Sequence, residues 1–513
     1  MTTVPQPSFN CVDWMVDRHV RSERGEHPAL VECGIDGRRR VLTYTQLRAA
    51  TARTADLLLA RINEAGRGRR IAILGSSTLE TLCAWLGAMR AGCLPFVIHP
   101  DLGEAAREAL LADFRPDLIC YDRTGYYAAG IALPAIDPEE VIDPLTAIPA
   151  AAPATARQPA FCLASSGSTG RAKICVHSHG AIPAFDCHVT RALWRMCADD
   201  VVLGSSGPYF SFGLQGIHTA LSLGATAVLL PEWARHEAFM ETIEREGVTV
   251  FLAVPTLLHL LMARASRIYR MRTLRLCLSA GERLPDAIRS RWEAYSGAYL
   301  VDSIGTTETF LPYLTEVPGE GAGLKEVAAF EYAFTAAECA SNEESAMTVA
   351  LTGRAMMLGY LESRPDALRW RQRPAFETGD LFSRVLGGWS FISRRSERVK
   401  IAGHWVSPQA LEAFLLTDAR VLQAAAVPVE TEVGLKRLRA FVVLGDAYRD
   451  GDAVTTALTR RMREELKPRA LRPDRIEVVS SLASSANGKL QRGEIAAAVA
   501  RQQVGAQRGV VPI

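Results

Sequence analysis

A short stretch of glycine and hydroxyl-bearing residues ends in a lysine and has the composition of a phosphate-binding loop. It comprises Ser165, Ser166, Gly167, Ser168, Thr169, Gly170 and Lys173. Glycines let backbone N–H groups approach an anion, hydroxyls donate hydrogen bonds, and the lysine adds a positive charge. The spacing is not that of a Walker A loop, and a flexible Ser/Gly turn is the alternative interpretation. The apolar run at 159–164 and the terminal lysine favour phosphate binding.

Three further polar segments carry groups that suit a nucleotide, although each is weak by itself. They are Asp302 to Glu308 (DSIGTTE), Glu377 to Asp380 (ETGD) and Ser484 to Lys489 (SSANGK). Each has an alternative interpretation: Thr307 and Glu308 suit a helix N-terminus, Asp380 suits a turn, and Lys489 suits a solvated surface. Gly305 and the apolar run before it favour a strand end for Thr307 and Glu308.

The elements that position these residues alternate between strand and helix. Apolar runs predict strands at 71–76, 93–98, 226–231, 248–255, 274–281 and 299–305, and helical spacing predicts helices at 78–90, 236–246, 256–265 and 284–296. This alternation predicts an α/β fold with largely parallel sheets. Ligands of such sheets bind beyond the carboxyl ends of the strands, so the loops after strands are the places to search for chemistry.

The pattern changes near residue 396, where a small α+β part is predicted to begin. Helices are expected at 408–416 and 454–466, and strands at 423–429, 437–444 and 475–482. We therefore predict a large part at 1–395 and a small part at 396–513. The Ala/Pro-rich segment 145–157 is expected to be a surface loop, and the residues from Gln502 onward a loose tail.

Composition excludes several classes of function. The 513 residues are 48% hydrophobic and 22% charged, with 58 Lys and Arg against 56 Asp and Glu. A formal net charge of +2 gives no electrostatic reason to bind nucleic acid. No apolar run approaches the length of a membrane helix, and no secretory signal is visible at the N-terminus. The 11 cysteines are scattered, so free thiols in a reducing cytoplasm are expected.

Four motifs in this order and approximate spacing resemble the adenylate-forming superfamily of acyl- and aryl-CoA synthetases, peptide-synthetase adenylation domains and luciferases. The glycine-rich loop departs from the family pattern at Ala172, where proline is usual, and at Ile174, where glycine is usual. Ile304 stands where the family often has tyrosine. Neither change in the glycine-rich loop removes a phosphate-binding group. The resemblance covers roughly residues 165–492 and implies the family's large α/β domain followed by a small mobile domain.

The resemblance implies two half-reactions and assigns a role to each motif. A carboxylate first attacks the α-phosphate of ATP to give an acyl-adenylate, and a thiol then displaces AMP. Lys489, Thr307, Glu308 and Lys400 are the expected catalytic residues, and Glu308 also helps to hold Mg²⁺. The expected nucleotide-binding residues are Ser165, Ser166, Gly167, Ser168, Thr169, Gly170, Lys173, Gly281, Glu282, Asp302, Ser303, Ile304, Asp380 and Arg394. Within this set, Asp302 is expected to contact the adenine amine, and Asp380 and Arg394 the ribose.

The small part resembles the family's moving domain. Its rotation would exchange Lys489 for the 400–406 loop between the half-reactions, with Ser396 as the hinge residue. Gly403 and Trp405 are expected to line the path of the thiol. Trp405 as a packing aromatic at a domain interface is the alternative. Ser396 departs from the Asp or Lys that the family usually has at the hinge.

The expected acid pocket is apolar, and the chain resembles most the benzoate/anthranilate-CoA ligase branch of the family. That likeness rests on 209–214, 279–282, 304–308 and 405–408. An aryl or bulky apolar acid is therefore expected, and an amino acid is less favoured because no acidic residue lies in 209–215. Leu311 stands where ligases of small benzoates tend to have histidine. The expected pocket residues are Tyr209, Phe210, Phe212, Gly213, Ala280, Gly305, Phe310 and Leu311.

The lead hypothesis is an ATP-dependent ligase that joins a carboxylic acid to coenzyme A, acting in the cytoplasm as a monomer or homodimer. One alternative keeps the adenylation step but delivers the acyl group to the phosphopantetheine of a carrier protein. A second alternative, from a different class, is a nucleotide-binding paralogue without turnover. Retention of Lys173, Thr307, Glu308, Asp380 and Lys489 argues against the second. No partner among nucleic acids or membranes is expected.

Overall fold

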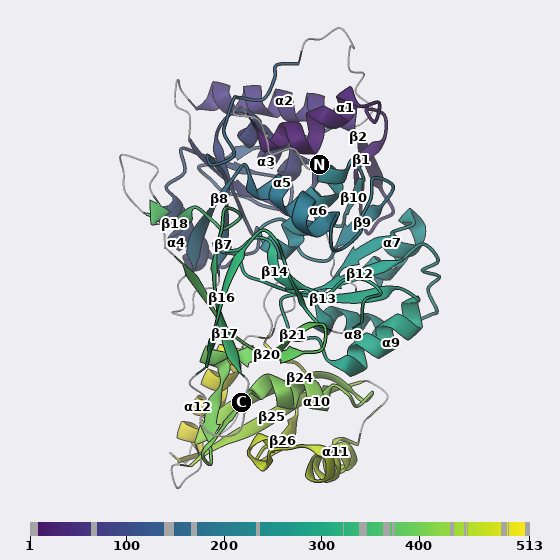
Figure 1. Ribbon diagram of the computed structural model, residues 1–513, viewed down its shortest axis with the longest axis vertical. Coiled ribbons are helices and arrows are strands. Elements are labelled where there is room, and N and C mark those ends of the chain that lie inside the picture. Colours follow the sequence, from purple (N-terminus) through teal and green to yellow (C-terminus); the bar gives the residue numbers. More distant parts are fainter. Residues whose placement is uncertain are drawn as a thin grey trace.

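The chain folds into a large part built on two mostly parallel sheets and a small C-terminal part below them (Figure 1). The computed structural model describes residues 9–62, 69–137, 148–165, 172–231, 236–321, 323–337, 346–362, 370–371, 375–430, 435–445, 448, 450–483, 490 and 492–507. The predicted α/β class is confirmed, because strands and helices alternate through most of the large part.

The first sheet has the strand order β15-β14-β13-β12-β11-β9-β10-β1-β2. The middle strands run parallel, whereas β2, β14 and β15 pair antiparallel with their neighbours. Its strands are β1 (Pro28–Cys33), β2 (Arg39–Thr43), β9 (Val201–Gly204), β10 (Thr226–Leu229), β11 (Val250–Leu252), β12 (Leu276–Ser279), β13 (Tyr299–Gly305), β14 (Pro312–Thr315) and β15 (Lys325–Glu326). The predicted strand 299–305 is confirmed at both ends, and the prediction at 248–255 was too long.

The second sheet has the order β19-β18-β8-β7-β4-β3-β5-β6. Its strands are β3 (Arg70–Leu74), β4 (Leu94–Ile98), β5 (Leu118–Tyr121), β6 (Ile131–Ala132), β7 (Pro159–Ser165), β8 (Lys173–Ser178), β18 (Gly359–Leu361) and β19 (Trp370–Arg371). β7 and β8 form an antiparallel pair on either side of the glycine-rich loop. β18 arrives from much later in the chain and pairs with β8.

Two buried helices join these sheets into one core. Every residue of α3 (Leu79–Arg90) is buried, as is most of α6 (Ser211–Leu223). Both contribute to a hydrophobic cluster that also contains strand residues of the two sheets, and burial of such surface is the main stabilising term in folding. The other helical segments are η1 (Asp13–Asp17), α1 (Arg18–Arg21), α2 (Tyr44–Arg61), α4 (Glu104–Phe114), α5 (Ala181–Phe185), η2 (Asp186–Thr190), α7 (Glu237–Glu246), α8 (Pro255–Arg264) and α9 (Asp286–Ser296).

Local sequence accounts for where the helices start. Thr43 and Gln46 form a reciprocal capping box at the start of α2, and Thr78 accepts the Thr81 N–H at the start of α3. Pro255 opens α8, where its missing N–H costs no hydrogen bond. These caps set the first turn of each helix next to the strand end that precedes it.

A third, antiparallel sheet lies between the large sheets and the small part. Its order is β16-β17-β20-β21, with β16 (Glu331–Ala336), β17 (Met347–Thr352), β20 (Phe376–Val385) and β21 (Gly388–Arg394). β20 carries Asp380, and β21 ends at Arg394 directly opposite it. This hairpin therefore brings two predicted nucleotide-binding residues together.

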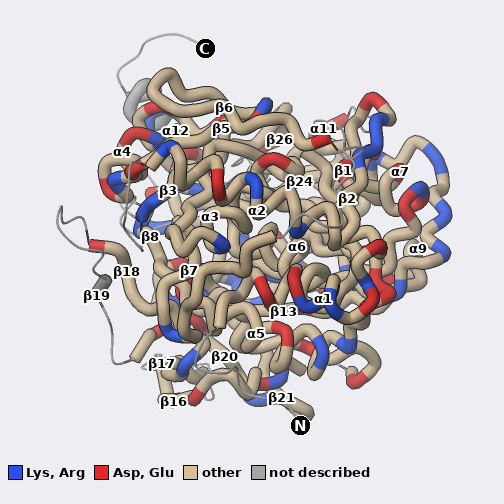
Figure 2. The backbone as a smooth tube through the Cα atoms, turned by 90° about the horizontal axis from the view of Figure 1, so that it is seen from above, with Lys and Arg blue, Asp and Glu red and all other residues tan. Residues whose placement is uncertain are grey.

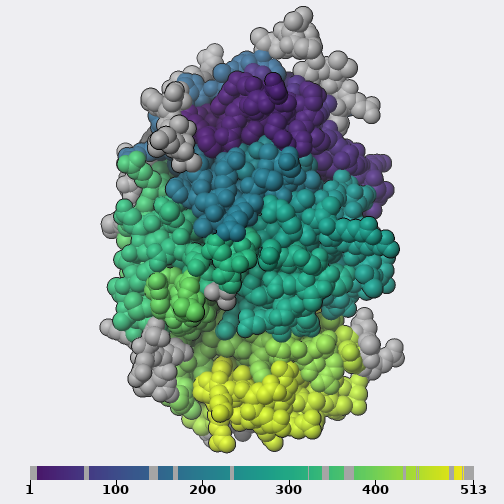
Figure 3. All heavy atoms as spheres, turned by 45° about the vertical axis from the view of Figure 1, so that its right-hand side comes forward, coloured from purple at the N-terminus to yellow at the C-terminus, as the bar shows by residue number. Residues whose placement is uncertain are grey.

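The small part follows β21 and forms one end of the molecule, coloured green to yellow in Figure 3. It has its own hydrophobic core. Its elements are η3 (Arg395–Glu397), β22 (Val399–Ile401), β23 (His404–Val406), α10 (Pro408–Leu415), β24 (Val421–Glu430), β25 (Lys436–Leu444), α11 (Gly451–Glu465), η4 (Arg469–Leu471), β26 (Ile476–Val478) and α12 (Arg492–Gln507). The expected loose tail was wrong in its start, because α12 runs through Gln507. The surface loop expected at 145–157 is confirmed over its described residues, 148–157.

Charges are mixed along the outer elements, and no helix of the described chain is long and apolar enough to cross a bilayer. In Figure 2, both acidic and basic positions occur on α4, α7 and α9 at the periphery.

Candidate functional site

A cleft of about 750 Å³, partly open to solvent, lies between the first sheet, the third sheet and the small part. It collects many of the residues that the sequence motifs singled out, although they are up to about a hundred positions apart in the chain. The lining residues are Gly281, Glu282, Arg283, Asp302, Ser303, Ile304, Gly305, Asp380, Phe391, Ile392, Ser393, Arg394, Glu397, Ser407, Gln409 and Arg492. The predicted adenine and ribose segments thus share one cavity.

One wall of the cleft follows the carboxyl ends of β12 and β13. Ser279 of β12 pairs with Asp302 of β13, so the loops beyond them leave the sheet side by side. Gly281 has φ +82°, a backbone conformation that side-chain-bearing residues rarely adopt. The Glu282 carboxylate accepts hydrogen bonds from the N–H and hydroxyl of Thr256 at 3.1 and 2.6 Å. Glu282 thereby ties this wall to the first turn of α8.

The carboxyl group of Asp302 faces a second carboxylate. Burial and the nearby charge of Glu316 raise the pKa of Asp302 to about 8, against the opposing effect of Arg289. Glu316 accepts the Asp302 backbone N–H at 2.8 Å and both oxygens accept from Arg289 at 2.9 Å. Glu316 directly follows the end of β14, and its carboxylate, in place of a strand carbonyl, accepts the Asp302 N–H of β13. Asp302 is therefore held in the cleft wall by an ion pair behind it.

Asp380 is the most deeply buried acidic residue of the cleft, with 1% of its surface exposed. It accepts hydrogen bonds from Arg394 Nε at 3.0 Å and from the Tyr313 hydroxyl. Burial raises the pKa of Asp380, and the Arg394 charge opposes that rise. A buried carboxylate with a paired guanidinium keeps its position because breaking the pair would leave an uncompensated charge.

Thr307 and Glu308 lie in a tight turn directly after β13, so the alternative of a helix start is wrong. Thr306 and Thr309 exchange hydrogen bonds, with the hydroxyl of each accepting the backbone N–H of the other, at 3.0 and 3.3 Å. The turn closes when the Phe310 N–H donates to the Thr306 carbonyl. The predicted placement at a strand end is confirmed.

The residue that closes this turn is strained in its backbone and enclosed by aromatic side chains. Phe310 has φ +57° and is fully buried, and a bulky residue in this region is a genuine outlier. Its ring lies 5.1 Å from that of Phe161, 5.3 Å from His177 and 5.0 Å from His218. The aromatic cluster therefore anchors the turn that presents Thr307 and Glu308.

The phosphate-loop residues lie at the ends of β7 and β8. Ser165 ends β7 and pairs with Lys173, the first residue of β8. Ser165 is buried, whereas Lys173 is exposed. The intervening Ser166, Gly167, Ser168, Thr169 and Gly170 lie outside the described residues.

The predicted acid-pocket residues are divided between the cleft and the core. Gly305 lines the cleft, and Ala280 precedes Gly281. Tyr209 lies 4.3 Å from His99 and 4.8 Å from Phe210 between ring centroids. A side chain at Gly213 would clash with backbone oxygens, since its first atom would lie 2.0 Å from the Gly207 carbonyl.

Three apolar members of that predicted set pack into the core. Phe310 and Leu311 are fully buried, and Phe212 packs against both large hydrophobic clusters. None of the three lines the described cleft. Whether they shape an acid pocket stays a prediction.

The predicted thiol-path residues lie away from the cleft. Lys400, Gly403 and Trp405 are exposed on the hairpin of β22 and β23, and Trp405 is 40% exposed. Lys400 and Trp405 line a separate recess with Arg398 and Lys436. Ser396 is exposed in the short turn η3 between the two parts.

Arg492 is a cleft residue that the sequence motifs did not single out. It comes from the small part and forms an ion pair with Glu412, which is itself 5% exposed. Lys489, three positions earlier, lies outside the described residues. Proximity to the predicted lysine motif is the one signal in the sequence that could have pointed to Arg492.

Glu308 is the one residue that the sequence predicted as a metal ligand, and it belongs to the described part of the chain. They contain no group of three or more His, Cys, Asp and Glu side chains that could hold a metal ion. Mg²⁺ often uses one or two carboxylates together with substrate phosphates and water. Glu308, at the carboxyl end of β13 and opposite the β8 strand that starts at Lys173, fits that requirement.

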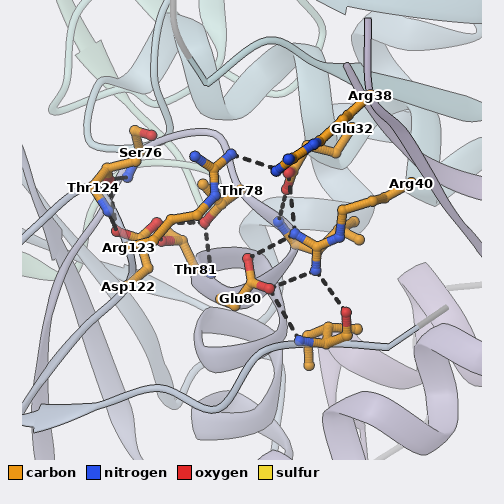
Figure 4. Close-up of polar contacts among 12 residues, drawn as sticks. Glu32, Arg38, Arg40, Ser76, Thr78, Glu80, Thr81, Asp122, Arg123 and Thr124 are labelled. Atoms are coloured by element: carbon orange, nitrogen blue, oxygen red, sulfur yellow. Dashed lines mark hydrogen bonds and ion pairs between the residues drawn. The ribbon is translucent and has the colours of Figure 1, made fainter. Parts of the chain in front are cut away.

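The carboxyl ends of β3 and β5 in the second sheet are occupied by side chains (Figure 4). Asp122 follows β5 and accepts hydrogen bonds from the hydroxyls of Thr78 and Thr81 and from the Thr124 N–H. Arg40 pairs with Glu32 and Glu80 beside them. A ligand is common at such a position in α/β sheets, but here the protein's own groups fill it.

Comparison with known proteins places these observations in context. A family model described as AMP-binding enzyme matches residues 16–328, and one described as AMP-binding enzyme C-terminal domain matches 410–489. A 4-hydroxybenzoate–CoA/benzoate–CoA ligase of Rhodopseudomonas palustris is 30% identical, over 95% of this chain and 94% of that protein.

Two solved structures share the fold over nearly their whole length. A benzoate CoA ligase from Burkholderia xenovorans has a TM-score of 0.80 and 25% identity, covering 95% of this chain and all of that one (100%). An anthranilate CoA ligase in complex with anthranoyl-AMP has a TM-score of 0.84 and 23% identity, covering 97% and 99%. At 23% identity the second comparison speaks for the fold alone.

Proposed function

Because the chain belongs to the AMP-binding enzyme family, we propose that it is an ATP-dependent aryl-CoA ligase. It adenylates an aromatic or bulky apolar carboxylic acid, transfers the acyl group to coenzyme A, and releases AMP and pyrophosphate. The observation that carries the proposal is the cleft in which the adenine and ribose motifs meet. The relative from Rhodopseudomonas palustris, named for 4-hydroxybenzoate and benzoate, supports the class of acid.

In the first half-reaction a carboxylate oxygen bonds to the α-phosphorus of ATP, and the bond to pyrophosphate breaks. Two anions must approach each other, so the protein has to supply cations and oriented donors. Lys173 supplies a cation at the start of β8, together with the loop residues Ser165 to Gly170. Thr307 would donate to the α-phosphate from its turn after β13. Lys489 is proposed to reach the carboxylate and the α-phosphate together.

The nucleoside would lie along the wall made by β12, β13 and the β20–β21 hairpin. Asp302 would accept from the adenine amine, beside Gly281, Glu282, Ser303 and Ile304. Asp380 would accept from the two ribose hydroxyls, and Arg394 would hold Asp380 in place. The hydrogen bond between Arg394 and Asp380, at 3.0 Å, supports these two roles.

Mg²⁺ is proposed to bind next to Glu308. When bound there, it would neutralise negative charge on the phosphates and so ease the approach of a second anion. Glu308 would give one oxygen ligand, and phosphate oxygens and water would give the others. The Lys173 ammonium would add a second positive charge on the phosphates.

In the second half-reaction the thiol sulfur bonds to the acyl carbon, the bond to the AMP phosphate oxygen breaks, and the thiol proton passes to solvent. Lys400, Gly403 and Trp405 would serve this step, yet they are exposed on a hairpin outside the cleft. A rotation of the small part, 396–513, relative to the large part, 1–395, would bring them in. Ser396, exposed in η3, would be the hinge.

The test is acid-dependent exchange of pyrophosphate into ATP, measured over a panel of benzoate, hydroxybenzoates, anthranilate, acetate and proline. Aromatic acids should support exchange, at least about 100-fold faster than proline, because the predicted pocket has no group for an ammonium. Preference for proline or acetate would contradict the assigned acid class. If a folded preparation showed no exchange with any acid of the panel, the ligase assignment itself would be contradicted.

A further inference from the structure

β18 comes from a segment that no sequence motif had marked, and it lies against the strand of the phosphate-loop lysine. Tyr360 of β18 pairs with Cys175 of β8, and Gly359 pairs with Val176. In an antiparallel pair, a residue also reaches the diagonal neighbour two positions along the partner strand on the same face. Lys173 is that neighbour of Tyr360. The register of β18 therefore sets the Tyr360 side chain beside Lys173.

The Tyr360 side chain contacts two groups that serve the phosphates in the proposed function. Lys173 Nζ lies over its ring, 5.1 Å from the centroid. Its hydroxyl donates a hydrogen bond to Glu308 Oε1 at 2.8 Å. The backbone next to it is fixed to the same turn, because the Met357 N–H donates to the Glu308 carbonyl at 3.0 Å. One side chain thus joins β8 to the turn after β13.

These two contacts differ in what they hold. An aromatic face attracts an ammonium without neutralising it, so Lys173 keeps its charge for a phosphate. The hydroxyl occupies one oxygen of Glu308 and leaves the other for a metal or water. Both effects arrange charges that the phosphates need, and neither requires Tyr360 to touch the substrate.

We propose that Tyr360 is a positioning residue that holds Lys173 and Glu308 in register for magnesium-bound ATP. The proposal rests on the assignment of both residues to ATP binding in the proposed function. Its ring acts on Lys173, and its hydroxyl acts on Glu308. Substitution separates the two actions, because phenylalanine keeps the ring without the hydroxyl, and leucine has neither ring nor hydroxyl.

The experiment measures equilibrium binding of ATP to the full-length protein by calorimetry, over a range of Mg²⁺ concentrations. Tyr360→Phe should raise the Mg²⁺ needed for half-maximal enhancement of ATP binding by about tenfold, since a hydrogen bond to a carboxylate is lost. Its affinity for ATP without Mg²⁺ should stay unchanged. Tyr360→Leu should in addition weaken ATP binding without Mg²⁺ by about three- to fivefold. Tyr126→Phe, at a residue that is 70% exposed, is the matched control and should resemble the unsubstituted protein.

A second readout separates positioning from general damage. Tyr360→Phe should slow pyrophosphate exchange but leave the reaction of supplied benzoyl-adenylate with coenzyme A unchanged, because that step involves no β- or γ-phosphate. Equal loss in both reactions, or magnesium-dependent binding identical to that of the unsubstituted protein, would overturn the proposal. If Tyr360→Leu does not fold, the phenylalanine variant still tests whether Tyr360 positions Glu308. If the unsubstituted protein binds ATP but activates no acid, the proposed function fails while the binding test of Tyr360 stands.

Discussion

Each acidic residue of the cleft is held by a partner from another element. Asp380 is paired with Arg394, and Asp302 is backed by Glu316 on Arg289. A buried charge without a partner is strongly destabilising, so these partners are part of the site. Residue types in the motifs pointed to the acids themselves. Arg394 was predicted from its motif, whereas Glu316 and Arg289 came into view only with the fold, because no motif marked them.

Asp302 leads to a prediction about pH and stability. Its pKa is raised to about 8 by burial and by Glu316, whereas an unfolded chain ionises it near about pH 4. Between these values the folded state binds a proton that the unfolded state lacks, so the stability of the fold falls as pH rises. The Asp302→Asn variant has no group here that ionises, so it escapes this fall in stability. Its melting temperature should exceed that of the unsubstituted protein by about 2 °C at pH 8.

The measurement is thermal unfolding of both proteins from pH 4 to pH 9, with Glu316, Arg289 and Arg283 left unchanged around Asp302. The difference in melting temperature should grow from about pH 4 to about pH 8 and then level off. Asp36→Asn, at an exposed carboxylate, is the control. A constant difference at every pH would refute this account of Asp302.

At the scale of elements, periodicity located most of the strands and helices that carry the site. β13 and α3 lie where the sequence put them, since long apolar runs and a Thr cap mark them clearly. Two features could not be predicted. The return of β18 to β8 pairs residues more than 180 positions apart, and local patterns hold no information on such partners. The turn at Thr306 to Thr309 depends on the buried Phe310 ring, which tertiary packing alone defines.

Two side chains of the large part bind the small part through its backbone. His259 of α8 donates from Nε2 to the Val421 carbonyl at 2.8 Å, and Arg291 of α9 donates to the Leu416 carbonyl at 2.8 Å. Burial lowers the pKa of His259, so its ring is neutral and Nε2 carries the proton. Leu416 is the C-cap of α10, and Val421 begins the edge strand β24. Carbonyls at a helix end and on an edge strand can bond water, so both can exchange these partners for water if the small part moves.

These contacts lead to a prediction about the two half-reactions. Arg291→Met should slow adenylation about fivefold, because each such hydrogen bond contributes about 1 kcal/mol to the observed orientation of the small part. The reaction of supplied benzoyl-adenylate with coenzyme A should not slow. The two rates are measured separately, with Arg267→Met, at an exposed ion pair with Glu244, as the control. Slowing of the thiol step by the same factor would show that the contact is merely structural.

At the scale of the whole molecule, the two parts differ in their chemistry. Among the described residues the cysteines are free, and every cysteine of the sequence precedes residue 396. The moving part would therefore bring no thiol of its own to the substrate. Length and composition indicated several domains but not their arrangement. The small part contacts α8 and α9 through two of its backbone carbonyls and through apolar side chains around Leu260, and no sequence motif marked these contacts.

The position of the boundary and the identity of the hinge stay predictions. The division at 395 and 396 falls within η3, directly after the strand that carries Arg394. Lys489 lies outside the described residues, so its role as the adenylation lysine is inferred from its motif. Arg492, three positions later, lies in the cleft.

The most direct test of the aryl-CoA ligase assignment is mass-spectrometric analysis of the products from benzoate or a hydroxybenzoate, ATP, Mg²⁺ and coenzyme A. The account predicts equal amounts of aryl-CoA thioester and AMP, and neither product when ATP or the acid is left out. Formation of ADP in place of AMP, or of AMP without a thioester for every aromatic acid tried, would contradict it.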